Sequence, residues 1–326
     1  MDGFRIPVGQ WARAAVDWIK ANLDGLLDVV TFVVRWLVDT LSDILVATPI
    51  PVVIVVAALL GWLVRSWQLG VGTLVTFVLI VGMDMWVSAM QTLALVLVAT
   101  IVAVLIAVPL GIWSARNATV RAILKPVLDF MQTMPAFVYL IPAIVFFGIG
   151  VVPGLVATVI FALPPGVRLT ELGIRSVDPE TVEAGHAFGA TPGQILRGIQ
   201  LPLATPTIMA GVNQVIMLAL SMAVIAGITG ADGLGKDVVE AISTVNLAKG
   251  IEAGLGVVII AVYLDRVTAA LGNPGAYPSS LLGILARRRN AHRAERAEAA
   301  AAASAGPTAA SAAALASASA GSADTE

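Results

Sequence analysis

Few of the side chains that carry out covalent or metal chemistry occur in this sequence. Cysteine is absent, and His186 and His292 are the two histidines among 326 residues. Without thiolates, and with no second histidine or cysteine near His186, disulfides, thiolate zinc sites and a nucleophile–histidine dyad are excluded as serious candidates. We interpret His186 as a surface histidine. The sequence predicts no catalytic residue, no metal site and no cofactor bound by this chain.

One glycine-rich run has nearly the spacing of a phosphate-binding loop. It reads Gly-Ala-Asp-Gly-Leu-Gly-Lys-Asp from Gly230 to Asp237. A P-loop requires Ser or Thr where Asp237 stands, and it lies between a strand and a helix, a context that this part of the sequence lacks. We therefore interpret the run as a glycine-rich turn after a membrane span.

The composition indicates an integral membrane protein. Hydrophobic residues make up 58% of the chain and charged residues 12%, whereas ordinary soluble domains carry about 25% charged residues. The formal net charge is −2, so no basic excess is available to neutralise a nucleic-acid backbone. The lipid bilayer is an expected partner, and nucleic acid is not.

Stretches without charge mark the predicted membrane spans, because about 20 apolar residues are needed to cross the hydrocarbon core as a helix. Proline and glycine between Phe130 and Val167 predict two shorter helices that fold back around Gly150 to Gly154. We predict an all-α integral membrane protein with about seven transmembrane helices. They lie near residues 49–66, 70–83, 86–113, 134–150, 152–168, 206–228 and 253–271.

Segments at both ends fall outside this predicted transmembrane domain of residues 49–271. In residues 1–48, four charged side chains share one helical face, at spacings of 7, 4 and 4 residues: Asp28, Arg35, Asp39 and Asp43. They predict an amphipathic helix from Leu26 to Val46, on the membrane surface or against the bundle rather than as an eighth span. Residues 272–326 are rich in Ala and Ser and predict a largely disordered cytoplasmic tail.

The distribution of Lys and Arg predicts the orientation in the cell inner or plasma membrane. If the loop of residues 169–205 is cytoplasmic, most Lys and Arg of the short loops fall on that side, as membrane proteins prefer. Lys236 and Lys249 remain on the outer side together with the N-terminal segment. The N-terminus is therefore predicted outside and the C-terminus in the cytoplasm.

The loop of residues 169–205 has the clearest local pattern. Asp178 before Pro179 predicts an N-cap with proline at the first helical position, and Gly189 predicts the end of that helix. Thr191 before Pro192 predicts a second start. The loop is therefore expected to form two short helices joined at a glycine turn.

This loop resembles the signature of permease subunits of binding-protein-dependent ABC importers. That pattern is Glu-Ala-Ala, three residues, Gly, nine residues, Ile, one residue, Leu-Pro. The matching residues are Glu183, Ala184, Gly185, Gly189, Ile199, Leu201 and Pro202, with Gly185 in place of the second alanine. The resemblance implies that the loop couples the permease to a separate ATP-binding subunit, which would hold ATP and Mg²⁺.

Further runs resemble the glycine betaine/proline betaine branch of these permeases. They are residues 131–140, 161–170, 200–214, 218–222 and 264–268. The resemblance implies the fold of a type I ABC importer permease, a second permease copy, and an extracytoplasmic binding protein that delivers a compatible solute. Glu171 departs from this branch, which usually has an apolar residue there, and it is predicted to pair with Arg175 four residues later.

The substrate stays open at this point. Choline, carnitine or an amino acid are alternatives within the same class of transporter. An ion-coupled secondary transporter is a less favoured alternative, because it should carry carboxylates at mid-membrane. Asp84 and Asp129 stand at the edges of predicted spans instead.

Four residues are candidates for the translocation path. Asn213 and Gln214 lie inside a predicted span, where amides either line a path or bond to a neighbouring helix. Phe137 and Tyr139 could offer aromatic faces to a quaternary ammonium ion, although aromatic residues also gather at membrane interfaces. Both alternatives remain open for each pair.

Overall fold

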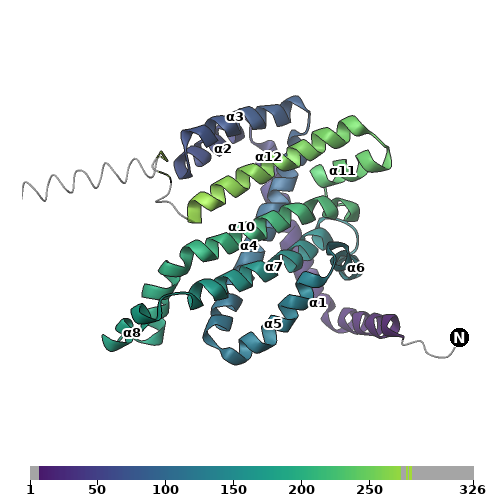
Figure 1. Ribbon diagram of the computed structural model, residues 1–326. Coiled ribbons are helices and arrows are strands. Elements are labelled where there is room, and N and C mark those ends of the chain that lie inside the picture. Colours follow the sequence, from purple (N-terminus) through teal and green to yellow (C-terminus); the bar gives the residue numbers. More distant parts are fainter. Residues whose placement is uncertain (1–6, 273–276, 278, 281–326) are drawn as a thin grey trace, which may run out of the picture.

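The computed structural model describes residues 7–272, 277 and 279–280, so the predicted tail lies almost wholly outside the described residues. Every regular element within that range is a helix, as predicted. The longest helices of the bundle are α4 (Trp86–Arg116), α7 (Val151–Arg175), α10 (Leu201–Ala226) and α12 (Leu247–Gly272). α7 packs along both α4 and α10, and α12 covers α10 (Figure 1).

Small residues bring α7 close to its two neighbours. A Cβ atom on Gly154 would lie 2.7 Å from the Cβ of Ala226 in α10. A Cβ atom on Gly166 would lie 2.9 Å from the Cβ of Ala107 in α4. Small residues at such contacts let membrane helices approach closely and gain van der Waals packing. These glycines account for the central position of α7.

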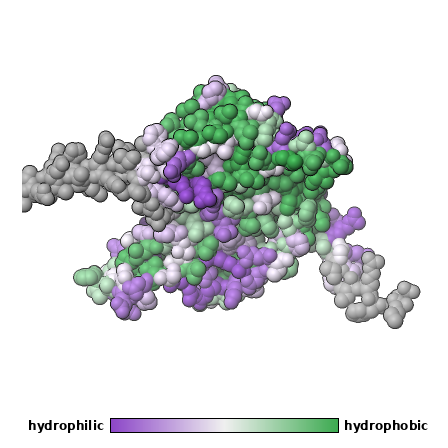
Figure 2. Space-filling view, turned by 45° about the horizontal axis from the view of Figure 1, so that its top comes forward, coloured by the Kyte–Doolittle hydropathy of each residue, from purple (hydrophilic) through white to green (hydrophobic). Residues whose placement is uncertain are grey.

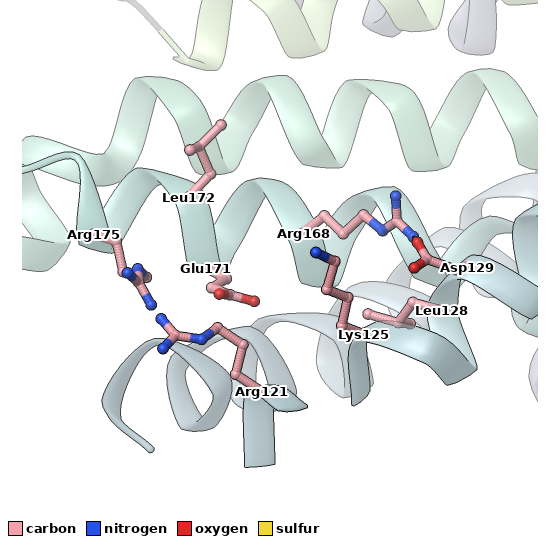
Figure 3. A pocket seen from close by; sticks show the side chains of 8 residues that line it. All are labelled: Arg121, Lys125, Leu128, Asp129, Arg168, Glu171, Leu172 and Arg175. Carbon is pink, nitrogen blue, oxygen red and sulfur yellow. The ribbon is translucent and has the colours of Figure 1, made fainter. Parts of the chain in front are cut away.

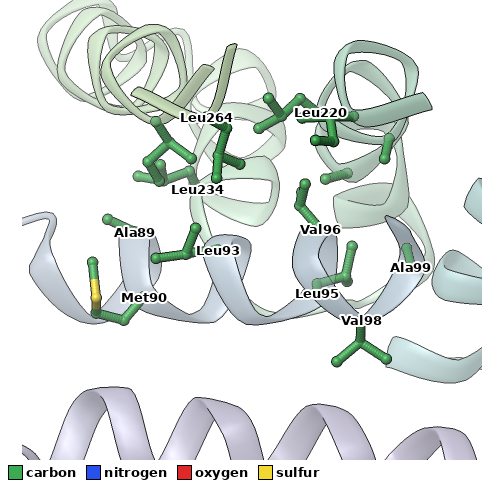
Figure 4. Packing of buried hydrophobic residues seen from close by; sticks show 14 of the residues in the cluster. Ala89, Met90, Leu93, Leu95, Val96, Val98, Ala99, Leu220, Leu234 and Leu264 are labelled. Atoms are coloured by element: carbon green, nitrogen blue, oxygen red, sulfur yellow. The ribbon is translucent and has the colours of Figure 1, made fainter. Parts of the chain in front are cut away.

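The main apolar core lies on the inward face of α4. Leu93 and Val96 of α4 face Leu220, Leu234 and Leu264, whereas Val98 lies toward α1 (Figure 4). The outer surface is also apolar over a broad area, with hydrophilic side chains gathered elsewhere (Figure 2). A large exposed apolar surface of this kind suits contact with lipid rather than water.

The structure differs from the sequence prediction in the number of spans. Among the residues that the structure describes, four helices are long and apolar enough to cross a membrane alone, rather than about seven. Three predicted spans form shorter helices of 15, 16 and 12 residues, namely α2 (Ile50–Val64), α3 (Trp67–Gly82) and α6 (Ala136–Phe147). These fall below the length of about 20 residues that a span requires.

Two of the short helices belong to bent pairs, and counting each pair as one span raises the total to as many as six. α1 (Val8–Ala47) meets α2 at an angle of 107°, and α5 (Ala118–Thr133) meets α6 at 100°. The breaks fall at Thr48-Pro49 and Met134-Pro135. A residue before proline is disfavoured in the α conformation, so the helix stops there.

Three other prolines do not mark helix ends or starts where the sequence suggested. α7 continues through Pro164 and Pro165 to Arg175, beyond the predicted end at residue 168. α10 already begins at Leu201 and holds Pro206 in its interior, rather than starting there. Proline is tolerated inside membrane helices where neighbouring helices and local adjustments compensate the lost backbone bond.

The N-terminal helix α1 is longer than the predicted amphipathic helix and has a non-helical residue at Leu23. Val34 and Val38 are buried and belong to the main core, so this part of α1 lies against the bundle. The four charged residues of the predicted face line one hollow on its exposed side: Asp28, Arg35, Asp39 and Asp43.

The glycine-rich run at 230–237 is a tight return from α10 into α11 (Leu234–Ser243). Gly233 has a φ of 122°, and a Cβ atom on Gly235 would lie 2.4 Å from the carbonyl oxygen of Ala223. Lys236 donates to the Asp232 carboxylate at 2.7 Å, and this hydrogen bond raises the pKa of Lys236. The glycines therefore allow close packing of the backbone, and Lys236 is paired with a carboxylate four residues earlier in the same turn.

Candidate functional site

The loop between α7 and α10 lies at one end of the bundle and contains two short helices (Figure 1). The first, α8 (Pro179–Ala187), begins at Asp178, whose carboxylate accepts bonds from the backbone N–H groups of Glu180 and Thr181. It also accepts a bond from the Thr181 hydroxyl, and these contacts lower the pKa of Asp178. The cap therefore keeps a negative charge at the helix N-terminus, where the helix dipole favours it.

Gly189 ends α8 as predicted. Its φ is 80°, in the left-handed region that favours glycine. The N–H of Ala190 bonds to the carbonyl of Gly185 at 3.1 Å, and the N–H of Gly189 bonds to that of His186 at 2.9 Å. This glycine-terminated ending satisfies the last carbonyls of the helix and turns the chain sharply.

The second short helix is continuous with α10. α9 (Pro192–Ile195) starts with a capping box between Thr191 and Gln194. The π-helix η1 (Leu196–Gln200) then joins it to α10, so helical structure runs from Pro192 to Thr229. Pro202 lacks an amide hydrogen and its ring crowds the carbonyl four residues earlier, which accounts for a widened turn at this point.

A packing contact explains part of the spacing of the loop signature. A Cβ atom on Gly185 would lie 2.8 Å from the Cδ1 of Ile199 and 3.4 Å from the Cγ1 of Ile195. α8 thus lies directly on the start of the continuous helix, and a small residue at 185 permits this approach. Leu201 is partly buried and Pro202 is exposed.

The outward side of α8 presents Glu183, Ala184 and His186, all exposed. Beside them Phe188 is 92% exposed, although it is a large apolar side chain. The signature comparison did not identify Phe188; the available signal was an aromatic residue directly before the glycine that ends a polar helix. A large aromatic side chain that is almost fully exposed is typical of a docking contact.

Asn213 lies between α10 and α12 and is bonded on both sides of its amide. Its Nδ2 donates to Asp265 Oδ1 at 2.8 Å, and its Oδ1 accepts from the Thr268 hydroxyl at 2.7 Å. Gln214, the next residue, is exposed. Asn213 therefore links two helices, and a role for either residue in the translocation path stays a prediction.

Tyr139 is buried, and its hydroxyl donates to the carbonyl of Met131. In a continuous helix that carbonyl would bond to residue 135, but Pro135 has no N–H to donate. Tyr139 thus compensates the break between α5 and α6. Phe137, two residues earlier, is 56% exposed.

The predicted path residues are not gathered at one place. Tyr139 packs in a small apolar cluster with Met222 of α10. Met222 lies nine residues after Asn213, which corresponds to about 13 Å along the helix axis. The aromatic pair and the amide pair therefore lie at different levels of the bundle.

The Tyr139 bond gives a first testable prediction. Tyr139→Phe should lower the melting temperature of the purified protein, because a buried carbonyl without a partner costs about 1–3 kcal/mol. Phe137→Leu, at an exposed position of the same helix, is the control and should melt like the parent. An unchanged melting temperature in Tyr139→Phe would mean that the bend does not depend on this bond.

Comparisons with known proteins point to the same family as the sequence signature of the loop. The model of a family described as the inner membrane component of binding-protein-dependent transport systems matches residues 107–272, about half of the chain. The chain belongs to this family. It is therefore a membrane component of a transport system that depends on a binding protein, as the loop signature predicted.

Other members of this family align with most of the chain. The glycine betaine/proline betaine permease protein ProW of Escherichia coli (strain K12) is 44% identical, over 86% of this chain and 82% of its own. The glycine betaine permease protein OpuAB of Bacillus subtilis (strain 168) is 47% identical, over 81% and 94%. The glycine betaine/carnitine permease protein GbuB of Listeria monocytogenes is 48% identical, over 81% and 95%.

Among solved structures, the chain is similar to a component of the MetNI methionine ABC transporter in an inward-facing conformation. The identity is 23% and the TM-score 0.49, over 56% of this chain and 90% of that one.

Proposed function

We propose that this chain is the permease subunit of an ATP-driven importer for a compatible solute such as glycine betaine or proline betaine. The names of three relatives at 44–48% identity include glycine betaine. Relatives named for choline or for carnitine alone align at 31% and 34% identity over 58% and 50% of the chain. Choline, carnitine or an amino acid remains the alternative substrate.

The partners follow from the same proposal. An extracytoplasmic binding protein delivers the solute, a second copy of the permease completes the path, and separate subunits bind ATP and Mg²⁺ and hydrolyse the nucleotide. This chain itself binds no cofactor. A homodimer is the simplest arrangement, because a symmetric pair needs one kind of permease.

Coupling is assigned to α8, and the exposed ring of Phe188 at the end of this helix is the observation that carries this assignment. α8 is capped at both ends and lies on Ile199, at the start of the continuous helix that includes α10. A rigid helix in this position transmits closure of the ATP-binding subunits to a membrane helix as a movement of one body.

Reconstitution tests the transport function. The permease, its ATP-binding subunit and its binding protein in vesicles should take up labelled glycine betaine only when ATP and the binding protein are present. Unlabelled proline betaine should compete. Uptake of an amino acid in place of glycine betaine would reject the proposed substrate but not the assignment as an ABC permease. Uptake driven by an ion gradient without ATP would reject the transporter class.

The orientation is part of the proposal, with the N-terminus outside and the C-terminus in the cytoplasm. Cationic side chains are gathered at the α8 end of the bundle, which suits the cytoplasmic side: Arg116, Arg121, Lys125, Arg175 and Arg197.

Single cysteines in this cysteine-free chain test the orientation. Ser243→Cys, exposed at the end of α11, should react with an impermeant thiol reagent in intact cells. Ala187→Cys, exposed in α8, should react only after the cells are opened. Labelling of Ala187→Cys in intact cells would reverse the orientation.

A further inference from the structure

A pocket between α5 and α7, at the α8 end of the bundle, gathers cationic side chains. Figure 3 shows Arg121 and Lys125 of α5 facing Arg168 and Arg175 of α7, with Glu171 between them. The remaining lining residues are Leu128, Asp129 and Leu172, and the pocket volume is about 490 Å³. Four cations against two carboxylates leave a surplus of positive charge.

The pocket has a paired inner end and an unpaired mouth. At the inner end, Arg168 forms an ion pair with Asp129. Glu171, which the sequence predicted to pair with Arg175, instead accepts a hydrogen bond from the Ser114 hydroxyl of α4 at 2.7 Å.

Three cations of the pocket therefore have no ion-pair partner among the described residues: Arg121, Lys125 and Arg175. We call these three residues the mouth of the pocket; all three line it, and the carboxylate of Glu171 lies between Lys125 and the two arginines (Figure 3).

The mouth lies where the membrane helix ends. Arg175 is the last residue of α7, and Arg121 stands in the first turn of α5. Arg168 lies seven residues before Arg175, about 10 Å deeper along α7. Because α7 is long and apolar enough to span the membrane, the unpaired cations stand near the level of the lipid headgroups.

The outer surroundings of the pocket are apolar. On the side of α5 away from the pocket, Ile123, Val127 and Phe130 are 62%, 48% and 65% exposed. On α7, Leu172 lines the pocket and is 56% exposed. A ligand at this mouth therefore meets the cations together with the exposed apolar side chain of Leu172, which favours an amphiphile over a free ion.

We propose that this pocket binds the phosphodiester headgroup of an anionic phospholipid through Arg121, Lys125 and Arg175. Guanidinium groups bind phosphate oxygens in a bidentate manner, and the ammonium group of Lys125 adds a point charge. Basic pockets between membrane helices on the cytoplasmic side are suited to such headgroups. The site does not depend on which solute the protein transports.

Native mass spectrometry of the assembled transporter tests the site, with dioleoylphosphatidylglycerol and dioleoylphosphatidylcholine as the two probes. The parent should retain the anionic lipid in preference to the neutral one. Arg121→Gln with Arg175→Gln should lose about tenfold or more in affinity for the anionic lipid, since each surface cation contributes about 1 kcal/mol. Arg116→Gln with Arg197→Gln removes the same charge at the same end and should bind like the parent.

Three different outcomes would each reject the proposal. Equal loss in both pairs of variants would mean general attraction to the surface. Displacement of the lipid by inorganic phosphate, together with phosphate binding to lipid-free protein, would assign a free-phosphate site. If Arg121→Gln with Arg175→Gln released the ATP-binding subunit but retained the lipid as the parent does, the pocket would be a contact for an acidic protein surface instead.

A charge-conserving double variant controls for the possibility that the double glutamine variant misfolds. Arg121→Lys with Arg175→Lys keeps the charge and should keep most of the lipid preference. Loss of the preference in this pair, with an unchanged melting temperature, would also contradict the proposal. Failure of lipid binding would leave ATP-driven uptake intact, so the site and the transport function are tested separately.

Discussion

Gly189→Val should abolish ATP-driven uptake and still leave the protein inserted in the membrane. Gly189 has open space around its Cα, so a larger side chain meets no neighbour. The obstacle is its φ of 80°, a backbone conformation that costs L-residues about 1–2 kcal/mol and is an outlier for β-branched ones. The valine would therefore change the end of α8 and move Phe188, the side chain that we propose docks on the ATP-binding subunit.

The measurement is uptake in vesicles that also contain the ATP-binding subunit and the binding protein. Gly72→Val is a matched control, because Gly72 also has open space but lies in the interior of α3 without a positive φ. Glu183→Lys, which inverts an exposed charge of α8, should likewise block uptake, whereas His186→Ala should have a much milder effect. Parental rates in Gly189→Val and Glu183→Lys would show that α8 is not the coupling element.

Gly235→Val should prevent the end of the bundle that contains α11 from folding. A Cβ atom there would lie 2.4 Å from the carbonyl oxygen of Ala223 and 2.9 Å from the Cα of Val224. These are backbone atoms of α10, so no side-chain rotation can relieve the contact. Gly227 faces the same segment, with its Cβ position 2.3 Å from the carbonyl carbon of Gly235. We expect a loss of about 3 kcal/mol or more in the free energy of unfolding.

The yield of membrane-inserted protein and its melting temperature measure this loss. Gly254→Val in α12 is the control, since nothing lies within 4 Å of a Cβ atom at that position. The control should be expressed and melt nearly as the parent does. If Gly235→Val had the same melting temperature as the control, α11 would not pack against α10 as closely as described.

Local features of the loop between α7 and α10 were predictable from the sequence because they depend on neighbours along the chain. The cap at Asp178 and the left-handed turn at Gly189 arise from residues within one helical turn, so residue types alone identify them. The predicted spans also coincide with helices, because charge-free runs reflect burial in lipid.

Features that depend on distant contacts were not predictable in this way. Pro164 and Pro165 suggested a helix end, but α7 continues because α4 and α10 enclose it on both sides. The partners of Asn213, Asp265 and Thr268, stand more than 50 residues later in the chain, so its link to α12 could not be read from the sequence. Phe188 is not part of the loop signature, and its exposure, which depends on the packing around it, became known only from the structure.

The continuous helix from Pro192 to Thr229 sets a strict rotational phase between the two ends of the molecule. Each residue in an α-helix advances the direction of the side chains by about 100°. One residue inserted or deleted in η1 would therefore turn the whole of α10 by that angle relative to α8, including the face on which Asn213 meets α12. Substitutions in η1 leave this phase unchanged, so the segment should tolerate many changes of residue type and almost no change of length.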